Sequence, residues 1–492
     1  MVWSCQENKH ISSQLFDDLT QDLHTCACLV VDLRLTRRKN RIFFARSRVP
    51  YILHEAKSVT SGRSWRGSQM MFEIKARLSV VAFAFCFSLP GLAIEKFTVS
   101  RDDALYEAFA DIAQAPGQTL VITYRESLMH APYPFSRVVV RRSLDGGNTW
   151  LPKQTLLEKD ATQNEGRLNC SRIAALSDGS LLLVVDFFPH GASELTGMDA
   201  IRILLFRSRD SGKTWEGPLE TGVRGAIVPS LKQLSNGDLL MGLTRLVAPD
   251  GTLANRREEQ LVYRSRDVGR TWEGPAVVPQ SAGIELNLNE GDFAEMDDGT
   301  VVIYMREDKE GFTGWKSFSR DGGRTWSTAY RARMFSVCGR PSVGRLRSGE
   351  VLVTYRTCAG VSASLALYAE TPAEAVRNMP RDRNNYRKDF YAGRFAVLDN
   401  DRSLYPDTGY SGWVQLPSGD LYVINYTVDD APRAYIRGYV VSRKDWFLFP
   451  EGDIPWQHAS REPYVEIAAE WAEKQAAANR TKDRTRRVPT QK

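Results

Sequence analysis

The residues of this chain that could do chemistry stand at fixed offsets from six turn glycines. Each glycine ends a polar turn and precedes an apolar segment; the six are Gly117, Gly179, Gly237, Gly299, Gly349 and Gly419. Nine residues before three of these glycines stand Glu290, Arg340 and Tyr410, and seven residues after three of them stand Asp186, Arg306 and Arg356. A carboxylate can take a proton from a phenol, and guanidinium groups can hold a substrate carboxylate through paired hydrogen bonds.

These offsets place the residues at one end of a repeated structural unit. From Arg101 to Val441 the chain reads as short alternating strands, and one pattern of strand, glycine turn and apolar strand occurs six times. Six such units predict an all-β fold, a six-bladed β-propeller of four-stranded antiparallel blades. The first strand of a blade lines the central channel, and its start meets the end of the second strand. We therefore expect these side chains at one mouth of the channel, as a functional site or as ion pairs between blades.

A second repeat, Ser-x-Asp-x-Gly-x-Thr-Trp, occurs at residues 143–150, 208–215, 265–272 and 319–326. Its Asp side chain can accept hydrogen bonds from the N–H groups of a tight turn, and its Gly can adopt a positive φ. Its Trp then packs the hairpin onto its neighbours. These motifs resemble the Asp boxes of the sialidase (neuraminidase) superfamily of β-propellers, which lie on the outer rim of that fold. The resemblance implies a structural role for all four copies.

The resemblance also implies roles for the residues at the mouth. Sialidases hold the sugar carboxylate with three arginines, use a tyrosine assisted by a glutamate as nucleophile, and use an aspartate as acid/base. Tyr410 resembles the nucleophile, and Glu290, sixteen residues before Arg306, resembles the glutamate that precedes the second arginine. Arg172 resembles the first arginine, although it falls in the second unit rather than the first and Ala174 stands in place of the usual proline.

Two parts of the sialidase set have several candidates in this chain. The acid/base is expected among Asp186, Glu194 and Asp199, which lie downstream of the first arginine. The third arginine of the family is absent from its usual place, so Arg340 or Arg356 would have to substitute for it.

The resemblance implies a secreted exo-acting glycosidase that hydrolyses a terminal acidic sugar from glycans, with sialic acid as the default and a uronic acid as an alternative. Two other functions stay open: a propeller that binds a glycan without turnover, and a lyase for uronic-acid polysaccharides that uses tyrosine as base and acid. The partner is in each case a glycan with a carboxylate-bearing sugar. No cofactor or metal is implied, because the three histidines after residue 93 are scattered and show no zinc spacing: His130, His190 and His458.

Charge separates the first 93 residues from the rest. The chain has 492 residues and a formal net charge of +6, and residues 1–93 carry a surplus of basic residues equal to that whole charge. The remainder is neutral, which argues against nucleic acid as the main partner. Residues 71–93 hold Lys75, Arg77, an apolar run too short to span a bilayer and a small-residue end, as in a secretory signal peptide cleaved after Ala93.

The sequence thus predicts four parts. Residues 1–70 are either an upstream extension outside the native protein or a leader of unknown role, and residues 71–93 direct secretion or export to the periplasm. Residues 100–447 form the propeller. Residues 448–492 hold an aromatic loop, a short C-terminal helix that packs on the propeller, and a basic disordered tail.

Overall fold

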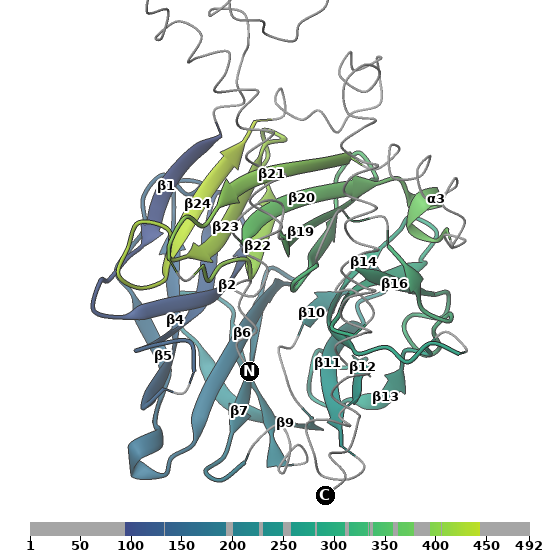
Figure 1. Cartoon of the computed structure of the whole chain (residues 1–492), viewed down its shortest axis with the longest axis horizontal. Coiled ribbons are helices and arrows are strands. Elements are labelled where there is room, and N and C mark those ends of the chain that lie inside the picture. The colour runs from purple at the N-terminus through teal and green to yellow at the C-terminus, as the bar shows by residue number, and fades with distance from the viewer. Residues whose placement is uncertain are drawn as a thin grey trace, which may run out of the picture. The chain divides into compact units, whose positions relative to one another are not determined.

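The described part of the chain consists of six four-stranded antiparallel sheets (Figure 1). The computed structural model describes residues 94–442, except residues 132, 193–199, 226–229, 249–256, 281–282, 310–313, 333, 335–337, 358–362, 378–393 and 405. The predicted six-bladed β-propeller is confirmed. The predicted leader, signal peptide and C-terminal helix lie outside the described residues.

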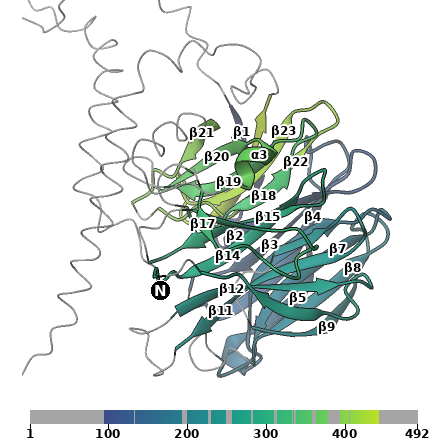
Figure 2. The same cartoon turned by 90° about the vertical axis from the view of Figure 1, so that its right-hand side faces the viewer.

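Each of the first five sheets contains four consecutive strands in chain order. Figure 2 shows the same sheets in a view turned by 90°. The first two sheets are β2 (Tyr106–Gln114), β3 (Leu120–Ser127), β4 (Phe135–Ser143) and β5 (Gln154–Asp160), then β6 (Arg167–Ala175), β7 (Leu181–Phe188), β8 (Arg202–Ser208) and β9 (Glu216–Arg224). The third and fourth are β10 (Ser230–Gln233), β11 (Leu239–Val247), β12 (Arg257–Ser265) and β13 (Glu273–Val277), then β14 (Leu288–Glu295), β15 (Val301–Glu307), β16 (Trp315–Ser319) and β17 (Tyr330–Arg331). The fifth is β18 (Ser342–Arg345), β19 (Val351–Thr357), β20 (Ser364–Glu370) and β21 (Arg394–Asn400), with the one-turn helix α3 (Pro372–Ala375) after β20.

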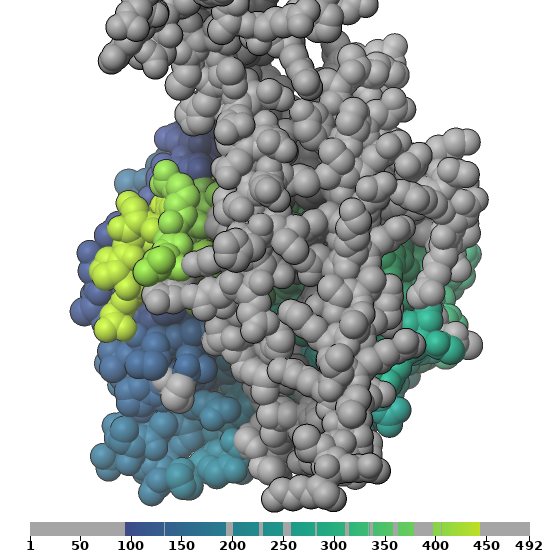
Figure 3. Space-filling view, in the orientation of Figure 1, coloured from purple at the N-terminus to yellow at the C-terminus, as the bar shows by residue number. Residues whose placement is uncertain are grey.

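The last sheet joins the two ends of the described chain. It runs in the order β22 (Ser411–Gln415), β23 (Leu421–Thr427), β24 (Tyr435–Val441) and β1 (Glu95–Ser100). The purple residues of β1 lie against the yellow residues of the last blade (Figures 1 and 3). Pairing of β1 with β24 closes the ring and covers a strand edge that would otherwise be open. The sequence pattern did not reveal β1, which begins before residue 100 and belongs to no glycine turn.

The six apolar segments that follow the turn glycines are the second strands of the blades, β3, β7, β11, β15, β19 and β23. Nearly all of their residues are buried. A strand covered on both faces has no solvent-facing positions, so its sequence is continuously apolar rather than alternating. Each turn glycine therefore marks the start of a buried second strand, and the first strand of the same blade, which faces the channel, comes just before it.

Carboxylates join the first strands of neighbouring blades near the channel. An oxygen of Asp111 in β2 accepts the Ile173 N–H of β6 at 3.0 Å. In the same way Asp292 in β14 accepts the Val343 N–H of β18 at 2.7 Å. These links fix the relative position of adjacent first strands, and with it the side chains at the mouth.

The four Asp boxes connect the third and fourth strands of the first four blades. In the first copy Asp145 accepts the Thr149 N–H at 2.9 Å and the Thr149 hydroxyl at 2.6 Å. The Ser143 hydroxyl donates to Asp145 and accepts the Gly147 N–H at 2.8 Å. The other three copies repeat this network with closely similar distances. The motif is a self-contained turn, as its sequence indicated.

Within the described ranges, no helix is both long and apolar enough to cross a membrane. The same part of the chain contains no group of three or more His, Cys, Asp or Glu side chains placed to hold a metal ion.

Candidate active site

Tyr410 stands immediately before β22, at the end of the channel where the last blade begins. The preceding Gly409 has φ +105°, and a Cβ at that position would overlap the side chain of Arg356. The Gly409 N–H donates to Asn425 of β23 at 3.0 Å. A positive φ and a side-chain anchor on the neighbouring strand together turn Tyr410 toward the channel.

Glu290 lies in β14 at a bulge, where the pairing with β15 shifts register between Asn289 and Asp292. Its φ is +50°, an uncommon conformation for a residue other than glycine. The neighbouring blade holds this shape, since the Glu290 N–H donates to Thr244 at 3.0 Å and the Gly291 N–H donates to Gln260 at 2.7 Å. Bulges redirect side chains beside functional sites, and this one directs a carboxylate into the channel.

The bulge and the tyrosine meet, because the Tyr410 hydroxyl donates a hydrogen bond to Oε1 of Glu290. The other carboxylate oxygen lies 3.2 Å from Nη1 of Arg306. Nε of Arg306 in turn donates to Asp308 at 2.7 Å, which fixes the guanidinium plane. The result is a buried chain of phenol, carboxylate and guanidinium across the channel.

The electrostatics of the pair favour an ionised glutamate and a protonated tyrosine. Burial of Glu290 opposes ionisation, but Arg306, the hydrogen bond from Tyr410 and the positive charge of Arg340 outweigh it, so the pKa of Glu290 lies below its usual value. Burial and the Glu290 charge raise the pKa of Tyr410 well above 10, against the opposing effect of Arg306. A proton that leaves the Tyr410 hydroxyl can therefore pass directly to Oε1 of Glu290.

Two more arginines flank the tyrosine. The guanidinium carbons of Arg340 and Arg356 lie 5.6 and 5.7 Å from the centre of the Tyr410 ring. Burial and the neighbouring charge of Arg172 lower the pKa of Arg340 to about 10. Like charges this close are unfavourable in a buried site unless an anion is nearby.

Arg172 reaches the same region from β6. Its Nη1 lies 3.3 Å from a carboxylate oxygen of Asp111 and 3.5 Å from the carbonyl oxygen of Ser411, the residue after Tyr410. Its Nε and Nη2 are buried, and among the described residues they have no hydrogen-bond partner. Buried donors without acceptors are costly, so an anionic ligand group at this point would stabilise the site.

The structure thus brings together six of the nine residues that the sequence singled out: Tyr410, Glu290, Arg306, Arg340, Arg356 and Arg172. Asp186 is fully buried beside them, and its oxygens accept the Cys170 N–H at 2.6 Å and the Asn169 side chain at 2.9 Å. Asp186 therefore supports the backbone of β6 in this structure. Glu194 and Asp199 lie outside the described residues.

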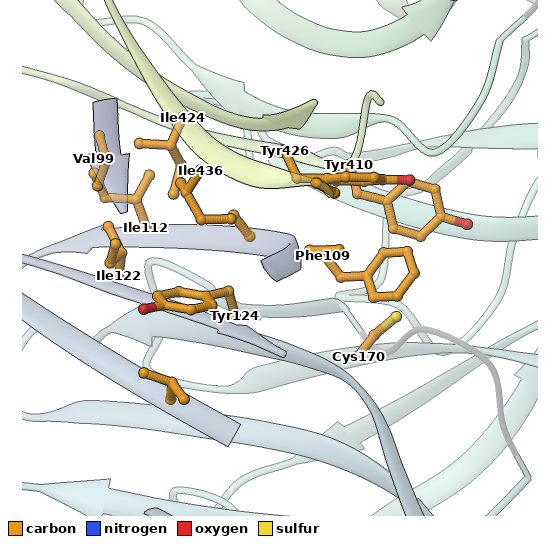
Figure 4. Close-up of a cluster of buried hydrophobic side chains, with 14 of the residues drawn as sticks. Val99, Phe109, Ile112, Ile122, Tyr124, Cys170, Tyr410, Ile424, Tyr426 and Ile436 are labelled. Carbon is orange, nitrogen blue, oxygen red and sulfur yellow. The ribbon is translucent and has the colours of Figure 1, made fainter. Parts of the chain in front are cut away.

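Aromatic residues that sequence reasoning did not select line the other side of Tyr410 (Figure 4). The ring of Phe109 lies 5.0 Å from that of Tyr410, and the ring of Tyr426 lies 6.1 Å from it. Phe109 has φ +62° at a bulge of β2, so a second first strand is bent at the mouth. Tyr426 stands seven residues after its turn glycine, an offset shared with Arg306 and Arg356 that marks it as a mouth residue.

A separate cavity of about 430 Å³ lies between β1, β21 and β24. Its acidic and basic side chains pair with each other: Arg437 contacts Asp399 and Asp429 at 2.7 and 2.8 Å, and Lys96 contacts Asp399 at 2.5 Å. These pairs join the fifth and sixth blades. We assign these pairs a structural role. Near Tyr410, by contrast, Nε and Nη2 of Arg172 have no acceptor among the described residues.

Comparison with known proteins shows what this propeller resembles. Residues 136–371 match the model of the BNR repeat-like domain. A sialidase from Bacteroides fragilis is 27% identical over 231 residues, which cover 41% of this chain and 39% of that relative. The matched part is therefore about two fifths of the relative's length.

Solved structures share the fold at low sequence identity. A protein of unknown function from Dyadobacter fermentans matches with a TM-score of 0.57 and 20% identity, over 72% of this chain and all of that one. A Hadza microbial sialidase matches with a TM-score of 0.53 and 18% identity, over 71% and 68% of the two chains. The NanB sialidase from Streptococcus pneumoniae matches with a TM-score of 0.52 and 12% identity, over 75% and 73%.

Proposed function

We propose that the chain is a glycoside hydrolase of the sialidase type that releases a terminal acidic sugar from glycans, because its propeller matches the BNR repeat-like domain over residues 136–371 and is similar to a sialidase over 231 residues. Sialic acid is the first substrate to expect, since the Bacteroides fragilis relative is a sialidase. The observation that carries the proposal is the hydrogen bond between the buried Tyr410 hydroxyl and Glu290, with Arg306 on the opposite carboxylate oxygen.

In this proposal the arginines bind the carboxylate of the sugar. Arg172 offers two buried N–H donors without partners among the described residues, and Arg340 lies close enough for its charge to oppose that of Arg172. A bound carboxylate would accept hydrogen bonds and lower the repulsion between these charges. Arg356, on the other side of Tyr410, completes the positive surroundings.

Tyr410 is the proposed nucleophile, and Glu290 is the base that accepts its proton. A neutral phenol does not repel an anionic sugar, whereas a carboxylate nucleophile would. As the phenol oxygen bonds to the anomeric carbon, its proton moves along the existing hydrogen bond to Glu290. Two such displacements in succession retain the anomeric configuration.

We also propose that residues 71–93 export the protein, so that it meets glycans outside the cytoplasm. N-terminal sequencing of the protein recovered from the producing cell's exterior or periplasm would identify the cleavage point. A mature protein that retained residues 1–70 would contradict this part of the proposal.

The activity is tested with purified protein and two sets of substrates, 4-methylumbelliferyl α-sialosides and glycosides of uronic acids. Release of free sugar by the parent and not by Tyr410→Phe supports the proposal. Proton NMR of the first-formed product distinguishes retention from inversion. An unsaturated, ultraviolet-absorbing product would instead indicate a lyase, and binding without any product would indicate a glycan-binding propeller.

A further inference from the structure

His130 lies in the loop between β3 and β4, at the same mouth as Tyr410, and hydrogen bonds fix its ring. Its Nδ1 lies 2.8 Å from Oδ2 of Asp407 and 2.9 Å from the Tyr106 hydroxyl. Asp407 precedes Tyr410 by three residues, so one short segment carries both the carboxylate that orients the imidazole and the tyrosine.

The partners of Asp407 determine which ring nitrogen of His130 carries a proton. Oδ2 also accepts the Tyr106 hydroxyl, and Oδ1 accepts the Tyr426 hydroxyl at 2.8 Å. Burial opposes ionisation of Asp407, but the hydrogen bond and charge of His130, with the two tyrosines, lower the pKa of Asp407 to about 2. An ionised carboxylate can only accept, so the Nδ1 of His130 must donate.

The other nitrogen, Nε2, is therefore the one that can exchange a proton. In the part of the chain that the structure describes, no side chain or backbone group bonds to it. The His130 side chain is 37% exposed, while Tyr106, Phe109 and Tyr410 are buried. A half-buried carboxylate on Nδ1 and an unpartnered Nε2 on a partly exposed ring are the arrangement of a histidine that works as general acid and base.

One aromatic ring separates His130 from the proposed nucleophile. The Phe109 ring lies 5.2 Å from the His130 ring and 5.0 Å from the Tyr410 ring. Contact with this one shared ring keeps the two side chains close enough for a single bound glycan to reach both. Among the described residues, charged groups that bond to this loop are Arg125, which donates to the His130 carbonyl oxygen at 2.8 Å, and Arg433, which donates to that of Leu128.

We propose that His130, oriented by Asp407, is the acid/base of the Tyr410 site, an inference that rests on the proposed hydrolase function. In the first step the glycosidic C–O bond breaks and its electron pair goes to the leaving oxygen, which takes the proton of Nε2. The Tyr410 oxygen bonds to the anomeric carbon, and its proton goes to Glu290. In the second step water attacks that carbon, Nε2 takes the proton of the water, and Tyr410 leaves as it recovers its own proton from Glu290.

Of the three residues that resemblance offered for this task, the structure describes only Asp186. Asp186 is fully buried and already accepts two hydrogen bonds from β6. Glu194 and Asp199 belong to a segment outside the described residues and are therefore controls in the experiment.

The test compares leaving groups in His130→Gln and the parent. A methylumbelliferone leaves as a stabilised anion and needs little help from an acid, whereas the lactose of a sialyl-lactose needs a proton. We expect His130→Gln to lose about 100-fold or more of kcat/KM on sialyl-lactose and less than about tenfold on the methylumbelliferyl sialoside.

Two further variants keep the inference falsifiable if His130→Gln folds poorly by circular dichroism. Asp407→Asn retains the imidazole and removes the carboxylate that orients it, so it should show the same dependence on the leaving group as His130→Gln, with a smaller loss. Tyr106→Phe keeps the ring and Asp407, and should affect both substrates equally and mildly. Glu194→Gln and Asp199→Asn should show no dependence on the leaving group.

The outcomes separate the two proposals. A parent that cleaves neither sialosides nor uronosides overturns the hydrolase function, and the role of His130 with it. A parent that cleaves them, with equal losses on both leaving groups in His130→Gln, overturns only the role of His130. The same holds if the dependence on the leaving group appears in Glu194→Gln or Asp199→Asn instead.

Discussion

Glu290 keeps its carboxylate at the tyrosine with a backbone that few residues other than glycine adopt. A non-glycine residue at φ +50° costs on the order of 1–3 kcal/mol, which the rest of the fold must offset. The hydrogen bonds from the Glu290 and Gly291 N–H groups to Thr244 and Gln260 hold this conformation. The fold thus holds Glu290 in an unfavourable backbone conformation that keeps its carboxylate at Tyr410.

Arg306→Lys should impair turnover although it keeps the positive charge. The guanidinium bonds Asp308 through Nε and Glu290 through Nη1, and one ammonium group cannot reproduce both directions. We expect kcat/KM to fall by about tenfold or more, corresponding to roughly 1.4 kcal/mol of transition-state stabilisation. Arg209→Lys, an exposed arginine on the rim, is the matched control and should leave the rate unchanged.

Gly409→Ala tests how closely the backbone positions the tyrosine. Both Gly409 and Gly237 have a positive φ, but an added Cβ meets Arg356 at the first position and nothing within 4 Å at the second. Both alanine variants should lose stability by about 1 kcal/mol from backbone strain. Only Gly409→Ala should also lose activity, by about tenfold or more, because it displaces Arg356 and Tyr410. Equal activity in the two variants would show that the position of Arg356 is unimportant.

At the scale of residues, the sequence indicated which residues at the strand ends lie at the mouth of the channel, but it did not indicate which loop residues lie there. Tyr410, Glu290 and the arginines keep a constant offset from the turn glycines, because the strand geometry repeats in each blade. His130 lies in a loop with no such repeat, and Asp407 lies three residues from Tyr410 but outside the strand register. Their contact joins positions 277 residues apart, which no local pattern reveals.

Among the elements, the Asp-box turns carry the clearest dependence on pH. The pKa values of Asp145 and Asp267 fall from 3.8 to about 2, first because the Thr149 and Thr271 hydroxyls donate to them, and then because of backbone and Ser hydroxyl donors. The unfolded chain therefore binds these protons more tightly than the folded one. Their contribution to stability is complete above about pH 4 and is lost as the pH falls toward 2.

We expect the thermal unfolding midpoint of the parent to fall across that interval. A variant with Asp145→Asn and Asp267→Asn should begin with a lower midpoint at neutral pH and show a shallower fall, because it has fewer depressed carboxylates to protonate. Differential scanning calorimetry from pH 5 to pH 2 measures both. Parallel curves for parent and variant would mean that the acid sensitivity arises elsewhere.

The same turns show why a motif can predict structure without function. The Ser and Asp side chains of each Asp box bond to groups of the same eight residues, so the motif's sequence is sufficient to predict its turn. All four lie between outer strands of the blades, and none contacts Tyr410 or Glu290. The residues of the proposed site lie instead on the first and second strands and on the loops at the mouth.

At the scale of the whole molecule, β1 holds the ring closed. The Phe97 ring packs 5.5 Å from that of Tyr422, and a Cβ on Gly438 of β24 would overlap Phe97. Gly438→Ala should therefore push β1 away from β24, lower the unfolding midpoint and speed cleavage near residue 97 by a protease. The control is the pair Gly438→Ala with Phe97→Ala, in which removal of the ring relieves the overlap.

If the overlap is the cause, the double variant is less destabilised than the sum of the two single variants. Simple addition of the two effects would contradict this account of the closure. The sequence predicted six blades of four strands, but the range that it gave the propeller, 100–447, left out nearly all of β1, the strand that completes the sixth blade. The missing strand pairs with a segment about 340 residues away, and only the closed ring requires it.

The central claim, that Tyr410 is the nucleophile, is tested most directly by trapping its bond to the sugar. A 2,3-difluoro derivative of sialic acid has a good leaving group and slows the second displacement, so a covalent intermediate should accumulate. Mass spectrometry of the digested protein should show the added sugar on the peptide that contains Tyr410, and the label should be absent from Tyr410→Phe. Label on another residue, or an active parent that never becomes labelled, would contradict the account.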